Sequence, residues 1–179
     1  MFPQNFGWVR ICLILGVIAS VSVSSPGDQR RKTVVNPAHC IPLSDTQQRW
    51  LTSEWQRYLD YTRICGIQNS KHKTVLLLVS VHADLYYKAQ PGQSVLQVQM
   101  PRPLLFLPSG AALGSLPYNF PEDPPAELRV TFARWVQGFP ERIELYLTDP
   151  RAAGDRSLSP LIWDESKKKF ASKEEQSHD

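Results

Sequence analysis

Proline places the strongest limit on what this chain can fold into, because seven of its fifteen prolines stand within residues 101–125. A proline has no N–H group to donate and fixes its own φ angle, so it interrupts helices and the interior of sheets. We therefore predict a long loop over residues 101–126, with at most an edge strand in the stretch LLFLP. This loop would separate two regions of regular structure.

The same loop is rich in large apolar side chains, among them Phe106, Tyr118 and Phe120. Loops of this length are uncommon in compact domains and are often functional. We therefore interpret the three aromatic residues as candidate contacts with a partner. The alternative is that the loop only crosses one end of the core and covers it.

The N-terminal region contains an apolar stretch, residues 11–23, that is too short to span a membrane. A helix of this length would reach about 20 Å, whereas the hydrocarbon core of a bilayer is about 30 Å thick. Arg10 precedes the stretch and the small residues Ser22 and Ser24 end it, which is typical of a cleavable secretory signal. We expect residues 1–24 to be removed and the product to be secreted or periplasmic, meeting the membrane only during export. The alternative is an uncleaved anchor that tethers the protein to the membrane.

Composition and charge indicate a globular protein and argue against nucleic acid as a partner. Charged residues make up 21% of the chain and hydrophobic residues 42%, and the net charge is only +3, without the clustered positive face that nucleic-acid binding requires. The residues after the predicted signal suit a single domain. We divide them into a flexible linker (25–39), a globular domain (40–163) and a disordered mixed-charge tail (164–179).

A long amphipathic helix is predicted over residues 45–64. Ser44 and Gln47 form a capping box at its start, and apolar residues recur at helical spacing along one face. We expect this face, which carries Trp and Tyr side chains, to lie on a sheet. Trp50 falls off the face and becomes a further candidate for an exposed partner contact.

Cys40 and Cys65 would remain after export, where paired cysteines usually form a disulfide. The predicted helix over residues 45–64 would be about 30 Å long, and the short connection from Cys40 to its start reaches at most about 17 Å. A disulfide needs Cα atoms about 5.5 Å apart. The unbroken helix and the Cys40–Cys65 disulfide therefore exclude each other, and the sequence leaves open which one forms.

After the helix, the hydrophobic pattern changes to a period of two, which is typical of strands. Trp135 falls on the polar face of one of these strands and is the last candidate contact. The predicted class is α+β, with the helix packed on a mainly antiparallel sheet of hairpins, and a β-sandwich with an N-terminal helix is the alternative. Strands are predicted at residues 74–87, 95–100, 127–136, 142–148 and 160–163, the third and fourth forming a hairpin around QGFPE.

His82 and Asp84 form the one polar pair that suggests chemistry, because both would project from one face of the predicted strand together with Ser80. Residues two apart on a flat strand rarely come within the roughly 3 Å that a Ser-His-Asp catalytic set requires. The other histidines have no zinc-motif spacing. We therefore predict no metal and no cofactor, and we keep Ser80, His82 and Asp84 as the only catalytic candidates.

These observations favour a secreted or periplasmic protein that is not an enzyme. It would be a binding or accessory protein that contacts a protein partner through the Pro-rich loop and a sheet edge. The alternative is a small exported hydrolase or metal-dependent enzyme centred on His82 and Asp84.

Overall fold

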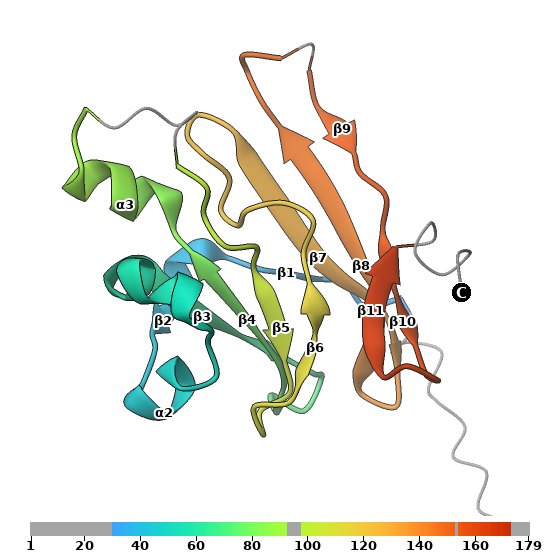
Figure 1. The fold of residues 1–179 in the computed structure, drawn as a ribbon. Coiled ribbons are helices and arrows are strands. Elements are labelled where there is room, and N and C mark those ends of the chain that lie inside the picture. The colour runs from blue at the N-terminus through green and yellow to red at the C-terminus, as the bar shows by residue number, and fades with distance from the viewer. Residues whose placement is uncertain (1–29, 93–97, 153, 173–179) are drawn as a thin grey trace, which may run out of the picture.

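The computed structural model describes residues 30–92, 98–152 and 154–172, which form two antiparallel β-sheets and a few short helices (Figure 1). The predicted signal peptide and residues 95–97 of a predicted strand lie outside the described residues. The helical elements are η1 (Pro37–His39), α2 (Asp45–Gln48), η2 (Ser53–Tyr61) and α3 (Ala83–Ala89). The strands are β1 (Thr33–Val34), β2 (Ile41–Pro42), β3 (Thr62–Gln68), β4 (Thr74–Val81), β5 (Leu104–Phe106), β6 (Ala112–Ser115), β7 (Glu127–Val136), β8 (Phe139–Thr148), β9 (Arg156–Ser157), β10 (Leu161–Asp164) and β11 (Lys169–Ser172).

Each sheet contains mostly strands that follow one another in the chain. The first sheet has the order β2-β3-β4-β5-β6, and the second has the order β1-β7-β8-β10-β11 with β9 paired to β8. The two sheets come into contact where β6 lies beside β11. At this point a Cβ atom on Gly114, whose φ is +123°, would lie 2.9 Å from the carbonyl oxygen of Phe170. Only glycine permits this close approach.

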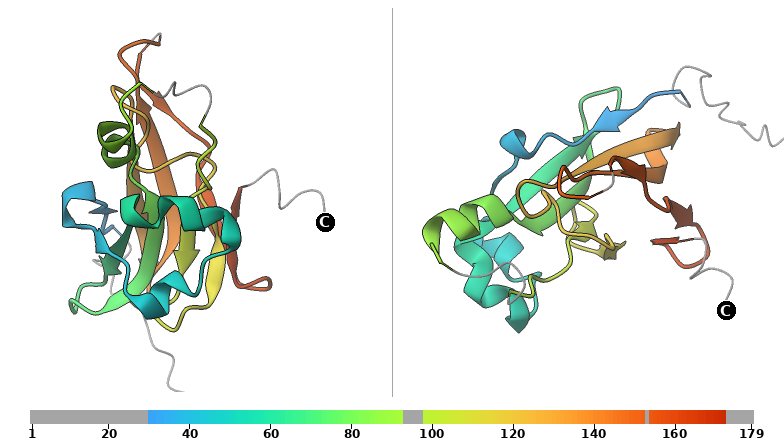
Figure 2. Two further views of the ribbon diagram at one scale, coloured as in Figure 1. Left: turned by 60° about the vertical axis from the view of Figure 1, so that its left-hand side comes forward. Right: turned by 90° about the horizontal axis from the view of Figure 1, so that it is seen from above.

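The main core lies between the sheets, and a smaller one covers the outer face of the first sheet. Leu76, Leu78 and Leu105 of the first sheet meet Val130 and Ile143 of the second, and all five are fully buried. The smaller core forms where η2 crosses the strands (Figure 2, left). It contains Leu51, Trp55, Tyr58, Ile64, Val79, Val81 and Phe106.

This layered arrangement confirms the β-rich, antiparallel class and corrects its details. The favoured prediction was a single sheet covered by one long helix, and the alternative was a β-sandwich with an N-terminal helix. The structure has two sheets, as in the alternative, but only short helical turns. The expected contact between an aromatic face and a sheet is confirmed, because Trp55 and Tyr58, each 1% exposed, pack on the first sheet.

The prediction of an unbroken helix over residues 45–64 is wrong. Its start is confirmed, because Ser44 and Gln47 form the capping box of α2. The helix ends after one turn, the chain begins again as η2, and from Thr62 onward it pairs with β4 as a strand. The segment TRICGIQ is rich in β-branched residues, and pairing with a buried strand outweighs the helical periodicity.

Three predictions about strands also need correction. Residues 98–100, the described part of the strand predicted over residues 95–100, do not form a strand. The strand predicted over residues 74–87 ends at Val81, and the rest of it forms α3. The loop predicted over residues 101–126 contains two strands, β5 and β6. The stretch LLFLP holds a central strand, because β5 pairs with both β4 and β6. Leu104–Phe106 contains no proline, and the prolines that flank it lie outside the paired residues, so they remove no hydrogen bond from this ladder.

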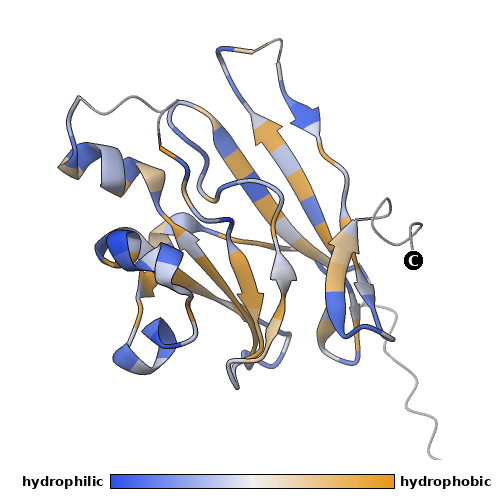
Figure 3. Cartoon of the chain, viewed as in Figure 1, coloured by the Kyte–Doolittle hydropathy of each residue, from blue (hydrophilic) through white to orange (hydrophobic). Residues whose placement is uncertain are grey.

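The predicted hairpin is confirmed as β7 and β8, and the hydropathy of its strands alternates along each of them (Figure 3). The exception is Trp135, which was expected on the polar face but is 0% exposed. Arg134 has a φ of +52°, in the left-handed region that side chains rarely adopt. At Arg134 the alternation of inward-facing and outward-facing side chains reverses, so Arg134 is exposed and Trp135 is buried. The Arg31 guanidinium lies 5.1 Å from the centre of the Trp135 ring and covers it.

The segments predicted to be a flexible linker and a disordered tail contribute strands. In the linker, β1 pairs with β7, and the amide of Val35 donates to the carbonyl of Val130 at 2.9 Å. In the tail, β11 pairs with β10 and buries Phe170 and Ala171. The short strand predicted at residues 160–163 is confirmed as β10, which also pairs with β8. Residues 25–29 and 173–179 lie outside the described residues, and no helix in the described part could cross a membrane.

Candidate functional site

A cleft of about 760 Å³ lies where β4 ends and β7 begins. One wall is the stretch of residues 35–40 that connects β1 to β2, and another is formed by residues 121–126 at the end of the Pro-rich loop. Arg63 of β3 and His82 after β4 line it from the first sheet. The cleft therefore combines proline and aliphatic side chains with a few charged groups, a composition typical of ligand sites.

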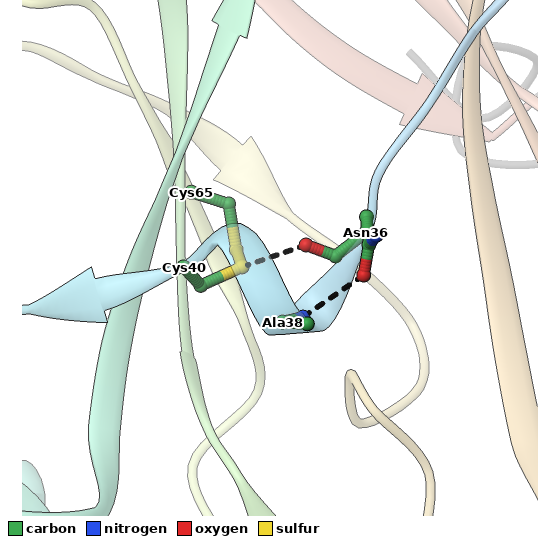
Figure 4. Close-up of a disulfide and its surroundings, with 4 residues drawn as sticks. All are labelled: Asn36, Ala38, Cys40 and Cys65. Atoms are coloured by element: carbon green, nitrogen blue, oxygen red, sulfur yellow. Dashed lines mark hydrogen bonds between the residues drawn. A yellow bond between two sulfur atoms is a disulfide. The ribbon is translucent and has the colours of Figure 1, made fainter.

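The Cys40–Cys65 disulfide forms at this cleft, which settles the alternative that the sequence left open (Figure 4). Ile41 of β2 faces Ile64 of β3, so the same register places Cys40 directly opposite Cys65. Their Cα atoms are 4.3 Å apart, close to the spacing of facing residues that exchange no hydrogen bonds in an antiparallel pair. Cys65 is buried, whereas Cys40 is partly exposed and lines the cleft. A disulfide of this kind is typical of an oxidising compartment.

A short turn holds Cys40 in place. Asn36 caps η1, and its side-chain oxygen accepts a hydrogen bond from the amide of Ala38 at 3.0 Å. The carbonyl oxygen of Asn36 lies 3.6 Å from the sulfur of Cys40 (Figure 4). The wall of residues 35–40 is therefore fixed at one end by β1, at the other by the disulfide, and between them by this cap.

His82 stands at the junction between β4 and α3, with only 5% of its surface exposed. Its backbone N–H donates to the carbonyl of Tyr61 at 2.9 Å. Burial lowers the pKa of the imidazole, although the nearby Asp84 carboxylate opposes this effect, and His82 is therefore neutral near pH 7. Its Nε2 is buried and has no hydrogen-bond partner among the described residues.

The three catalytic candidates do not assemble into a Ser-His-Asp set. His82 and Asp84 both line the cleft, on either side of the start of α3. Ser80 is fully buried and lies outside the cleft lining, and its Oγ, like Nε2 of His82, has no partner in the described chain. The missing Ser80–His82 hydrogen bond removes the activation that a serine nucleophile requires.

Most of the candidate partner contacts are buried. Phe120 and Trp135 are 0% exposed and Phe106 is 2% exposed, so none of the three presents surface to a partner. Trp50 is partly buried and packs on Phe106, with ring centres 5.4 Å apart. Tyr118, at 36% exposed, is the most exposed of the five. The Pro-rich loop therefore covers the core with its aromatic residues and lines the cleft with its prolines.

Glu122, which lines the cleft, and its neighbour Asp123 both lie in surroundings that disfavour an ionised carboxylate. Burial raises the pKa of Glu122, and the amide of Asp123, which donates to its Oε1, opposes the effect. Burial also raises the pKa of Asp123, against the attraction of Arg151. Ionised carboxylates at these positions therefore reduce the stability of the folded chain.

Glu122→Gln is expected to raise the melting temperature at pH 7. The pKa of Glu122 is higher in the folded than in the unfolded chain, so its stabilising contribution is complete below the unfolded pKa and is lost as the pH rises through the folded pKa. The gain from the substitution should therefore shrink as the pH falls and disappear once the carboxyl is protonated in both states. Thermal unfolding between pH 3 and 8, a range set around the ordinary pKa of about 4.3, measures this gain.

Glu127→Gln, which removes a charge from an exposed part of the same cleft, is the control. An equal rise in melting temperature from both variants would contradict the raised pKa assigned to Glu122.

The sequence did not predict that Cys40, Cys65 and His82 would meet. The β-branched residues of TRICGIQ are a local signal for a strand, but the register that places Cys65 opposite Cys40 and on the same side of the first sheet as the end of β4 comes only from the structure. The function must be inferred from this geometry, because no protein-family profile, curated protein or solved structure matches the chain.

Proposed function

We propose that the chain is an exported, non-enzymatic binding protein that holds an extended segment of a partner protein in this cleft. The observation that carries the proposal is the cleft of about 760 Å³, whose wall contains the end of the Pro-rich loop. Pro121, Pro124 and Pro125 give that wall a rigid apolar surface. Arg63 and Glu122 provide polar groups that can fix the orientation of a bound chain.

Exposed apolar side chains beside the cleft favour a protein segment over a small molecule. Val34 is 56% exposed and Ile41 is 62% exposed. They flank the cleft-lining stretch of residues 35–40 in the chain, and they belong to β1 and β2, each an outer strand of its sheet. A small molecule would fill the cleft alone, whereas an extended segment can also pair with a strand edge and cover these side chains.

Site-specific photo-crosslinking in the cells that produce the protein tests the proposal. A photo-reactive residue at Ala38 or Pro125, both exposed and at the cleft, should give an adduct with one defined protein. The same residue at Lys71, which is exposed in the turn between β3 and β4, should give none. Ala38→Trp, which fills the cleft from an exposed position, should abolish the adduct formed at Pro125 without lowering the melting temperature.

Equal adducts at Lys71, or adducts that persist in the Ala38→Trp variant, would place the contact elsewhere. The alternative is an enzyme centred on His82 and Asp84, which line the cleft, whereas Ser80 does not. This alternative predicts that Asp84→Asn abolishes a hydrolytic or metal-dependent activity while the crosslinked adducts remain.

A further inference from the structure

Three side chains with metal-binding atoms meet beside the cleft, each from a different element. The sulfurs of Cys40 and Cys65 and a ring nitrogen of His82 all lie within 4.8 Å of one another. Cys40 comes from the turn before β2, Cys65 from β3 and His82 from the end of β4. Two cysteines and one histidine are a ligand set used by zinc sites.

The disulfide keeps this set from binding a metal, because the ligand form of cysteine is the thiolate. The imidazole is nevertheless already in position. Nε2 of His82 is buried and has no hydrogen-bond partner in the described part of the chain, an unfavourable arrangement for a polar atom. A metal ion bound through Nε2 would supply the partner that this atom lacks.

We propose that reduction of the Cys40–Cys65 disulfide opens a Zn²⁺ site made of Cys40, Cys65 and His82. A dithiol reductant supplies the two electrons: one of its thiolates attacks a sulfur of the disulfide, and its second thiol then resolves the mixed disulfide. The reductant leaves as a cyclic disulfide and the protein keeps two thiols. Zn²⁺ binding then releases the two thiol protons, and both thiolates become ligands.

The spacing of the three side chains suits this ion. Zn–S bonds of about 2.3 Å and Zn–N bonds of about 2.0–2.1 Å, in tetrahedral geometry, place the ligand atoms roughly 3.5–3.8 Å apart. The present separations are within 4.8 Å, so the sulfurs need only move apart by side-chain rotation once their bond is broken. Three protein ligands leave a fourth position open, and Cys40 and His82 both line the cleft. The inference does not depend on the proposed partner.

Zinc titration of the oxidised and reduced chain tests the site. Every sample carries Cys12→Ser, so that only Cys40 and Cys65 can respond, and the reductant is removed without oxygen before Zn²⁺ is added. The reduced chain should bind one Zn²⁺, and Co²⁺ in its place should give the intense near-ultraviolet band of cobalt–thiolate bonds. His82→Gln should weaken zinc binding roughly tenfold or more, since even the loss of an outer partner of a ligand costs 10–100-fold.

His39→Gln is the matched control, because His39 is next to Cys40 but exposed and outside the cluster. It should bind zinc as the parent chain does. A reduced chain that binds no zinc overturns the proposal, and so does a His82→Gln chain that binds as tightly as the parent. Equal binding by the oxidised chain would also overturn it. Matching melting temperatures of the oxidised parent and His82→Gln chains confirm that the variant is folded.

Discussion

Cys40→Ala is expected to lower the free energy of unfolding by about 3–4 kcal/mol, the value that loop-closure entropy gives for a loop of this size. The disulfide joins residues 25 positions apart, and its removal lets the unfolded chain reach many more conformations. Cys40 is only partly buried, so its truncation leaves little cavity to add to this loss. Urea unfolding of the oxidised parent and the variant measures the difference.

The loss of stability on removal of the disulfide should be uneven across the fold. Both β1 and β2 are only two residues long, and the disulfide is the covalent tie between their connection and the first sheet. Amide exchange at Val35, which donates to Val130, should therefore accelerate more than exchange in the β7–β8 hairpin. The reduced parent chain is the control and should match Cys40→Ala. A difference below 1 kcal/mol between oxidised parent and variant would show that the tie contributes little.

The sequence predicted the strands best where one face of a strand is buried and the other is not. The alternation in Leu128, Val130 and Phe132 indicates which side chains point inward, and all three are buried. Such a pattern depends only on local spacing, and the fold follows it until Arg134 reverses the alternation.

The predictions failed where the pattern was compatible with two structures. Apolar residues between Leu51 and Thr62 have helical spacing, yet only part of this stretch is helical and the chain continues as β3. The choice depends on pairing with β4 and on the disulfide, which are contacts between distant parts of the chain. The strand predicted through His82 failed for a related reason, because Ala83–Ala89 contains good helix formers and leaves the sheet.

The site could be predicted only in part, because the cysteine pair was evident but its neighbours were not. Chain length alone shows that the straight helix and the disulfide are incompatible, and the disulfide is the one that forms. Placing His82 beside the sulfurs requires the register of β3 and β4, in which Cys65 faces Leu78. No local pattern in the sequence contains that register.

Phe120→Ala is expected to reduce the free energy of unfolding by about 3–5 kcal/mol, the usual cost of removing a buried phenylalanine. Phe120 is 0% exposed and belongs to the main core between the sheets. The loop that carries it would then lose its largest anchor in the core, and the cleft wall at Pro121 follows directly in the chain. Chemical denaturation monitored by tryptophan fluorescence measures the change.

Tyr118→Ala provides the matched control, because it removes an aromatic ring two positions away in the same loop. Tyr118 is 36% exposed and lies outside both cores, so its loss should cost less than about 1 kcal/mol, as is usual for surface positions. The pair distinguishes the two roles that the sequence allowed for this loop. A large loss only at Phe120 means that the loop is part of the core, so that only its remaining surface is open to a partner. Similar small losses at both positions would mean that the loop is not anchored, and the cleft wall that it builds would then not be fixed in place.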